Sequence, residues 1–156
     1  MTVAEKLVQQ TGVIGEKLVI GGFETLSAAY VGKYIHAGNK IATLSGFSIS
    51  SEGIEDVAKN VAMQAAAMNP IALDESGVDQ STIDKEIEIA KDQLRQEGKP
   101  EAMLDNIAKG KLKRFFKDNT LVNQDFIKNS KQSVAAYVKS NNSDLKITGF
   151  KRVALV

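Results

Sequence analysis

The residues that could do chemistry are few, and their spacing does not build a familiar catalytic site. His36 is the only histidine of the 156 residues, and no cysteine is present to join it in a zinc site. Ser45 stands in the run TLSGF, which lacks the first glycine of a nucleophile elbow. The pair Gly110-Lys111 follows Asp105 at the position where a phosphate-binding loop needs glycine. We therefore expect no enzyme, no catalytic residue, no metal ion and no cofactor.

Two groups of charged residues are explained more simply by helix surfaces than by a reaction. A solvated helix face accounts for the carboxylates of Asp84, Glu86 and Glu88. The basic residues between 109 and 117 suit the C-terminal end of a helix, where the last carbonyl groups lack partners. The alternative is a generic α+β interaction module that contacts ribosomal RNA through this basic helix end. Since the net charge is only +1, we expect no nucleic-acid partner.

The composition is ordinary for a globular domain. Apolar residues make up 43% and charged residues 25% of the chain, and its length fits one domain. The longest purely apolar runs are too short to span a membrane. The N-terminus MTVAEKLVQQTG lacks the basic start and apolar core of a signal peptide. We expect a cytoplasmic protein without membrane contact.

Local patterns predict helices and three strands. Thr2 and Glu5 have the spacing of a capping box, which begins a helix at about 3–11 that Gly12 ends. The residues from 27 to 37 remain ambiguous. The other expected elements are strands at 16–24 and 40–48 with a turn at Gly38-Asn39 between them, a helix from Ile54 to Pro70, a helix at 130–141 capped by Ser130, and a last strand with Leu145, Ile147, Val153 and Leu155 on one face.

Residues 82–117 predict an antiparallel helical hairpin. Apolar residues recur at coiled-coil spacing on both sides of Gly98-Lys99-Pro100, and Pro100 is acceptable only in the first turn of a new helix. A turn centred near residues 98–99 places Asp84, Glu86 and Glu88 opposite Lys113, Lys111 and Lys109.

Three ordered segments are similar to the core domain of bacterial elongation factor Ts. They are YIHAGNKI at 34–41, NIAKGKLKRFFKDNTLVNQDF at 106–126 and TGFKR at 148–152. VIGEKLVI at 13–20 resembles the IGEN-type strand of the same family. The resemblance covers roughly residues 13–156. It implies a single two-layer α+β domain over 1–156, in which helices cover a three-stranded antiparallel sheet and the hairpin at 82–117 is an insertion.

The resemblance also implies the function and the residues that carry it. The family binds elongation factor Tu and helps GDP to leave it, without covalent chemistry. Its contacts to the third, β-barrel domain of elongation factor Tu fall here on Ile14, Gly15, His36, Ile127 and Lys128. The alternative for His36 is a half-buried histidine that is satisfied within its own fold.

The departures from the family imply a fragment. The N-terminal helical module and the TDFV segment, which disturbs the magnesium and nucleotide site of elongation factor Tu, are missing, and Asp125-Phe126 aligns with another segment. We expect the docking half of a longer factor. Because the family's sheet packs against a sister subdomain or a second chain, an uncovered sheet is expected to join two copies through the strands at 16–24 and 40–48.

Overall fold

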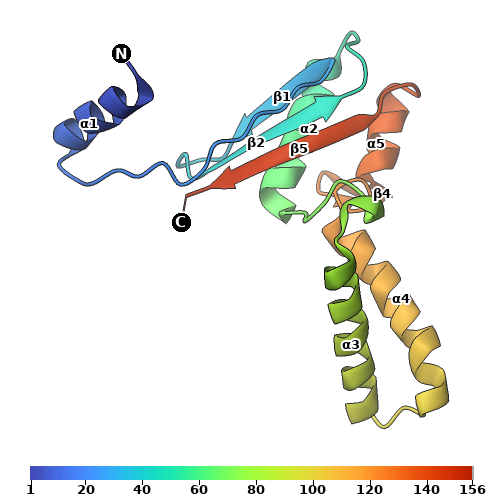
Figure 1. Cartoon of the computed structure of the whole chain (residues 1–156). Helices are drawn as coiled ribbons and strands as arrows, with labels where there is room; N and C mark the ends of the chain where they lie inside the picture. Colours follow the sequence, from blue (N-terminus) through green and yellow to red (C-terminus); the bar gives the residue numbers. More distant parts are fainter. Residues whose placement is uncertain (156) are drawn as a thin grey trace.

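The computed structural model describes residues 1–155 and has an α+β architecture (Figure 1). Its elements in chain order are α1 (Val3–Ile14), β1 (Tyr30–Ile35), β2 (Ile41–Phe47), α2 (Ile54–Met68), the 3₁₀ turn η1 (Glu75–Gly77), α3 (Gln80–Gln96), α4 (Glu101–Asn119), β3 (Asp125–Phe126), β4 (Asn129–Ser133), α5 (Val134–Asn141) and β5 (Ile147–Ala154). The expected fold class is confirmed.

The main sheet has three antiparallel strands in the order β1-β2-β5. A short turn joins β1 to β2, in which the amide of Asn39 donates to the carbonyl of His36 over 3.0 Å. Gly38 and Asn39 have φ angles of 86° and 56°, in the left-handed region that glycine and asparagine tolerate. The predicted turn is therefore present, and it pairs β2 with β1.

Helix α2 covers one face of this sheet, and two hydroxyl groups fix its position. Thr43 Oγ1 donates to the carbonyl of Ala62 over 2.7 Å. Ser45 Oγ donates to the carbonyl of Ala58 over 2.8 Å. Both serve buried carbonyl groups of α2, so the helix lies against β2 in a defined register.

The hydrophobic core lies where α2, α5 and the short β3–β4 sheet meet at one end of the main sheet. It contains Phe47, Val57, Val61, Leu121, Phe126, Val134 and Val138. Backbone hydrogen bonds join the segment before α3 to the segment after α4. The amides of Leu121 and Val122 donate to the carbonyls of Ala72 and Leu73. The helical hairpin and the β3–β4 sheet are therefore both anchored on the same hydrophobic core.

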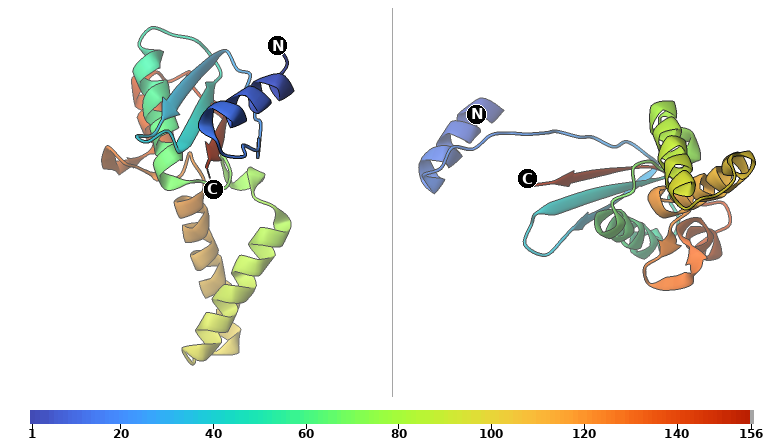
Figure 2. Two further views of the ribbon diagram at one scale, coloured as in Figure 1. Left: turned by 90° about the vertical axis from the view of Figure 1, so that its left-hand side faces the viewer. Right: turned by 90° about the horizontal axis from the view of Figure 1, so that it is seen from below.

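Helices α3 and α4 project away from the sheet as a hairpin (Figures 1 and 2). Its predicted break is confirmed, since α3 ends at Gln96 and α4 begins at Glu101. Lys91 Nζ lies 2.8 Å from Asp105 Oδ1, and this hydrogen bond lowers the pKa of the Asp105 carboxyl below its ordinary value. No helix in the described part of the chain is long and apolar enough to cross a membrane.

The register expected for the hairpin is confirmed, since the pairs Lys91–Asp105 and Arg95–Glu101 centre its turn at residue 98, but the charge pairs expected from that register were wrong. Among the ion pairs of residues 1–155, none joins Asp84, Glu86 or Glu88 to the lysines at 109–113. Residues two apart lie on different sides of a helix, so the three carboxylates cannot all face α4. The cations of α3 instead pair with acids of α4, as Arg95 does with Glu101 over 3.1 Å.

The strand predicted at 16–24 was wrong, because these residues belong to neither a helix nor a strand. The strand beside β2 is β1, within the segment that the sequence left ambiguous. The capping box of Thr2 and Glu5 is confirmed, yet Gly12 lies inside α1 and Gly15, with a φ of 78°, ends the helix. A strand needs a partner for its hydrogen bonds. The short Gly38-Asn39 turn brings residues 30–35, rather than 16–24, beside β2.

Two expectations near the C-terminus were also wrong. Ser133, not Ser130, caps α5: its Oγ accepts from the amide of Ala136 over 3.1 Å, and residues 129–133 form β4. The register between β2 and β5 shifts at Phe47, which pairs with Ile147 while its neighbour Gly46 pairs with Gly149. This bulge adds one residue to β5 and reverses the alternation beyond it. The apolar residues at 147 and 153 therefore lie on opposite faces.

Candidate partner-binding surface

His36 lies in the turn between β1 and β2 and is exposed. Its amide donates to the carbonyl of Ile41 over 2.9 Å, which continues the strand pairing into the turn. Its ring nitrogen Nδ1 lies 3.1 Å from the hydroxyl of Tyr34. When that hydroxyl donates to Nδ1, the ring carries its hydrogen on Nε2. Because the side chain is exposed, Nε2 can donate a hydrogen bond to a carbonyl group of a partner. The half-buried alternative for His36 was wrong.

Ile127 and Lys128 are the two residues of the turn between β3 and β4, whose flanking residues Phe126 and Asn129 pair. Ile127 is 42% exposed, although it follows the buried Phe126. Lys128 is exposed, and its Nζ donates to Asn60 Oδ1 over 2.6 Å. The turn therefore presents an apolar side chain beside a cation whose position is fixed.

Ile14 and Gly15 lie at the end of α1. Ile14 is 53% exposed, and Gly15 ends the helix with its amide donating to the carbonyl of Thr11 over 2.9 Å. The space around Gly15 is open, since nothing lies within 4 Å of the position a side chain would take. A partner's backbone can therefore approach closely here.

The structure places these five residues in three separate places. Helix α1 stands apart from the sheet. The β1–β2 turn lies at the end of the sheet near the C-terminus, and β4 lies on the side of α2 that faces away from this turn (Figures 1 and 2). Such an arrangement fits contact with an extended protein surface better than enclosure of a small molecule.

The sheet face opposite α2 is only partly covered. The segment 22–28 runs along part of it, where Glu24 pairs with Lys151 over 3.1 Å and Leu26 lies beside Gly46 and Gly149. Beside this segment, a hollow of about 370 Å³ has walls that include Phe23, Ile35 and Val153, all exposed. The open face therefore carries apolar side chains that a protein surface could cover.

Comparison with known proteins identifies the family of this chain. The family model described as Elongation factor TS matches residues 1–156. The elongation factor Ts of Flavobacterium psychrophilum is 71% identical over 155 residues, which are 99% of this chain and 57% of that protein. Those of Christiangramia forsetii and Amoebophilus asiaticus are 68% and 47% identical, and the chain covers 57% and 56% of them.

The chain belongs to the elongation factor Ts family. It spans somewhat more than half the length of these relatives. The family assignment confirms the resemblance and the expected link to translation elongation. The roles of the five surface residues and the division into domains stay predictions.

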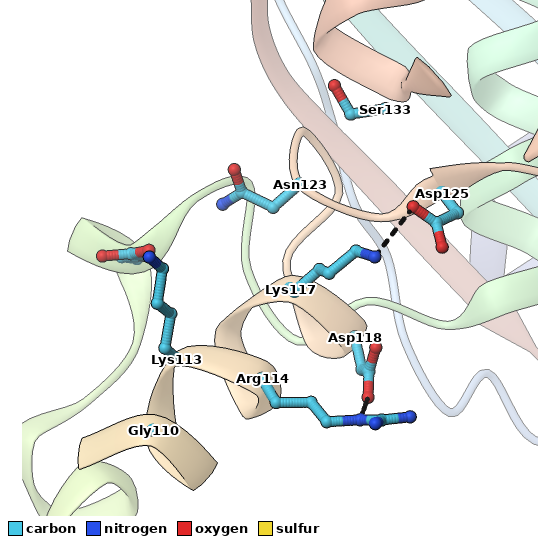
Figure 3. A pocket seen from close by; sticks show the side chains of 9 residues that line it. Gly110, Lys113, Arg114, Lys117, Asp118, Asn123, Asp125 and Ser133 are labelled. Carbon is cyan, nitrogen blue, oxygen red and sulfur yellow. Dashed lines mark ion pairs between the residues drawn. The ribbon is translucent and has the colours of Figure 1, made fainter. Parts of the chain in front are cut away.

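The basic end of α4 does not favour the alternative of an RNA-binding module. Lys113, Arg114 and Lys117 line an open hollow of about 630 Å³. Figure 3 shows these side chains together with the carboxylates of Asp118 and Asp125. Arg114 pairs with Asp118 over 3.5 Å, and Lys117 pairs with Asp125 over 3.2 Å. These carboxylates offset the positive charge that a phosphate backbone would need. Within residues 1–155, no group of three or more Asp, Glu or His side chains could hold a metal ion.

Asn60 and Gln64 were missed by the sequence reasoning. Both lie on α2 and bond to the segment that contains the β3–β4 turn. A signal existed, since Asn60 and Gln64 are the only polar residues in the apolar, alanine-rich stretch 60–68 and, four residues apart, share one face of the helix. That face could not be assigned a neighbour from the sequence, because the turn it meets lies more than 60 residues further along the chain.

Proposed function

We propose that this chain is the docking part of a guanine-nucleotide exchange factor that binds elongation factor Tu in the cytoplasm and performs no catalysis itself. The observation that carries the proposal is the elongation factor Ts match along the whole chain. The exposure of Ile14, His36 and Ile127, which the family resemblance assigns to the partner contact, supports it. Exposed apolar and hydrogen-bonding side chains on separate elements suit the centre of a protein–protein interface.

Docking and exchange are separable in this proposal. A factor releases GDP only if it binds the nucleotide-free partner better than the GDP-bound one, since equal affinity for both shifts nothing. The resemblance assigns that difference to the TDFV segment, and no such run occurs between Met1 and Val156. This chain is therefore proposed to bind elongation factor Tu and to accelerate GDP release only weakly.

A binding titration with purified elongation factor Tu tests the docking proposal. His36→Ala is expected to weaken binding by about 1–2 kcal/mol, or about 5–30-fold, if the imidazole donates a hydrogen bond at a buried interface. Lys139→Ala, on the exposed surface of α5, is the control and should bind like the parent chain. Equal affinity of the His36 variant and the parent would remove His36 from the site, and absence of parent binding would refute the docking proposal.

Two further measurements distinguish the alternatives. Release of fluorescent GDP from elongation factor Tu with saturating chain should stay far below that caused by a complete elongation factor Ts. Acceleration comparable to the complete factor would contradict the separation of docking from exchange. Binding to ribosomal RNA that falls steeply with salt would instead favour the RNA-binding module.

We also propose that two copies associate at high concentration through the open sheet face. The exposed Phe23, Ile35 and Val153 support this proposal. Residues 16–24, which were expected to join the two copies, form no strand. The proposal therefore gives this contact to the edge strand β1. Light scattering near millimolar concentration should report a dimer that Ile35→Lys weakens, and a strictly monomeric parent would contradict it.

A further inference from the structure

The turn between β3 and β4 lacks the residues that favour a tight hairpin turn. Two-residue hairpin turns commonly use Asn-Gly or Asp-Gly because both central residues then adopt positive φ. Here the central residues are Ile127 and Lys128, and neither is among the described residues with positive φ. Local preference therefore does not specify this turn, and contacts from elsewhere in the fold must hold it.

Gln64 supplies one of those contacts from inside the protein. Its side chain is fully buried in α2. Its Oε1 accepts from the amide of Ile127 over 2.9 Å, while its Nε2 donates to the carbonyl of Asp125 over 3.1 Å and to Gln124 Oε1 over 3.3 Å. The side-chain amide of Gln64 therefore donates two hydrogen bonds to the segment 124–127 and accepts one from it. An apolar residue here would leave the Ile127 amide and the Asp125 carbonyl without these partners.

Asn60, one helical turn earlier on the same face of α2, supplies the second contact. Its Oδ1 accepts from Lys128 Nζ over 2.6 Å, and its Nδ2 donates to the hydroxyl of Tyr137 in α5 over 2.8 Å. The ring of Tyr137 stacks on Phe126, with ring centres 4.0 Å apart and planes 12° from parallel. The residue before the turn and both turn residues are therefore each held by a side chain of α2 or α5.

We propose that Asn60 and Gln64 are positioning residues, which hold the β3–β4 turn in the conformation that presents Ile127 and Lys128 to elongation factor Tu. This inference rests on the proposed docking function. Neither amide has to touch the partner: Gln64 is fully buried, and the exposed Ile127 is the side chain that it orients. Fixing the turn before binding reduces the ordering that association would otherwise require.

The first test measures the turn without any partner. Gln64→Met keeps the length of the side chain and removes its hydrogen bonds. The amide of Ile127 should then exchange with solvent about 2–10-fold faster, the factor that one net hydrogen bond represents. Gln96→Met, the same substitution at the exposed end of α3, is the control and should leave this exchange unchanged. Unchanged exchange at Ile127 in folded Gln64→Met would overturn the proposal.

The second test links the turn to docking. Gln64→Met and Ile127→Ala should each weaken binding to elongation factor Tu several-fold. The double variant should bind no worse than the weaker-binding single variant, because Gln64 is proposed to act only through the position of Ile127. Multiplied effects in the double variant would mean that Gln64 does not act through Ile127. If Gln64→Met does not fold, Asn60→Ala at the part-buried position is tested in the same cycle with Lys128→Ala. A parent chain that does not bind refutes the docking function itself, whereas the exchange of Ile127 still reports on the turn.

Discussion

Replacing Gly32 by alanine is expected to separate α2 from the sheet. A methyl group at this position of β1 would come within 2.5 Å of Ala58 Cβ, 2.8 Å of the Ala58 carbonyl carbon and 2.8 Å of Ser45 Oγ. Carbon atoms do not approach one another so closely in a folded protein. One blocking atom belongs to the backbone of α2, so a change of side-chain rotamer cannot relieve the clash and the helix must move.

The cost follows from two terms. Overpacking of a filled core costs about 1–3 kcal/mol. Movement of α2 also lengthens the 2.8 Å bond from Ser45 Oγ to the carbonyl of Ala58, and such a bond contributes about 0.5–1.5 kcal/mol. We expect the free energy of unfolding to fall by about 2–4 kcal/mol, which corresponds to about 5–15 °C in Tm for a chain of this length.

Urea unfolding followed by circular dichroism measures this loss. The midpoint should fall with little change in the slope m. Gly110→Ala is the matched control: this glycine lies inside α4 with nothing within 4 Å of the added carbon, and alanine there should stabilise the chain by about 0.5–1 kcal/mol. A stability of Gly32→Ala within about 0.5 kcal/mol of the parent, the ordinary range for uninvolved surface positions, would refute the packing argument.

Three further changes test other parts of the fold. Phe126→Ala should cost about 3–5 kcal/mol because it empties a buried aromatic position; a urea midpoint like that of the parent would contradict this. Ser133→Ala should cost about 1 kcal/mol through loss of the α5 cap, whereas Ser130→Ala should change stability by less than about 0.5 kcal/mol; equal effects would contradict the assignment of the cap. The hydrogen bond from Lys91 lowers the pKa of the Asp105 carboxyl below its ordinary value. Its contribution to stability is therefore present above the pKa of the unfolded chain and is lost as pH falls through the lower folded pKa. Thermal unfolding at pH 7 and pH 3 should therefore show a smaller acid-induced loss for Asp105→Asn, and an unchanged loss would contradict it.

The sequence predicted those features whose causes are local. The capping box of Thr2 and Glu5 and the stop at Pro70 depend on residues within one or two turns of a helix. The break at Gly98-Lys99-Pro100 likewise separates the two helices of the hairpin. For the candidate site, family resemblance selected residues such as Ile14 and Ile127, and their exposure is compatible with that selection.

Features that depend on a distant partner were decided only by the tertiary structure. Residues 16–24 and 30–35 are both rich in β-forming residues, but only the second lies within a short turn of β2 and obtains its hydrogen bonds. The bulge beside Phe47 reverses the faces of β5, which a strict alternation of apolar residues in the sequence cannot reveal.

The β3–β4 turn shows the same division most clearly. The sequence by itself determined the family, the helices and the absence of a familiar catalytic motif, because these depend on residue identity and short spacing. It did not determine how Ile127 is presented, because the backbone there is held by Gln64, 63 residues earlier in the chain. A buried amide satisfies backbone groups wherever the fold brings them, and that position is known only once α2 and the turn are packed together.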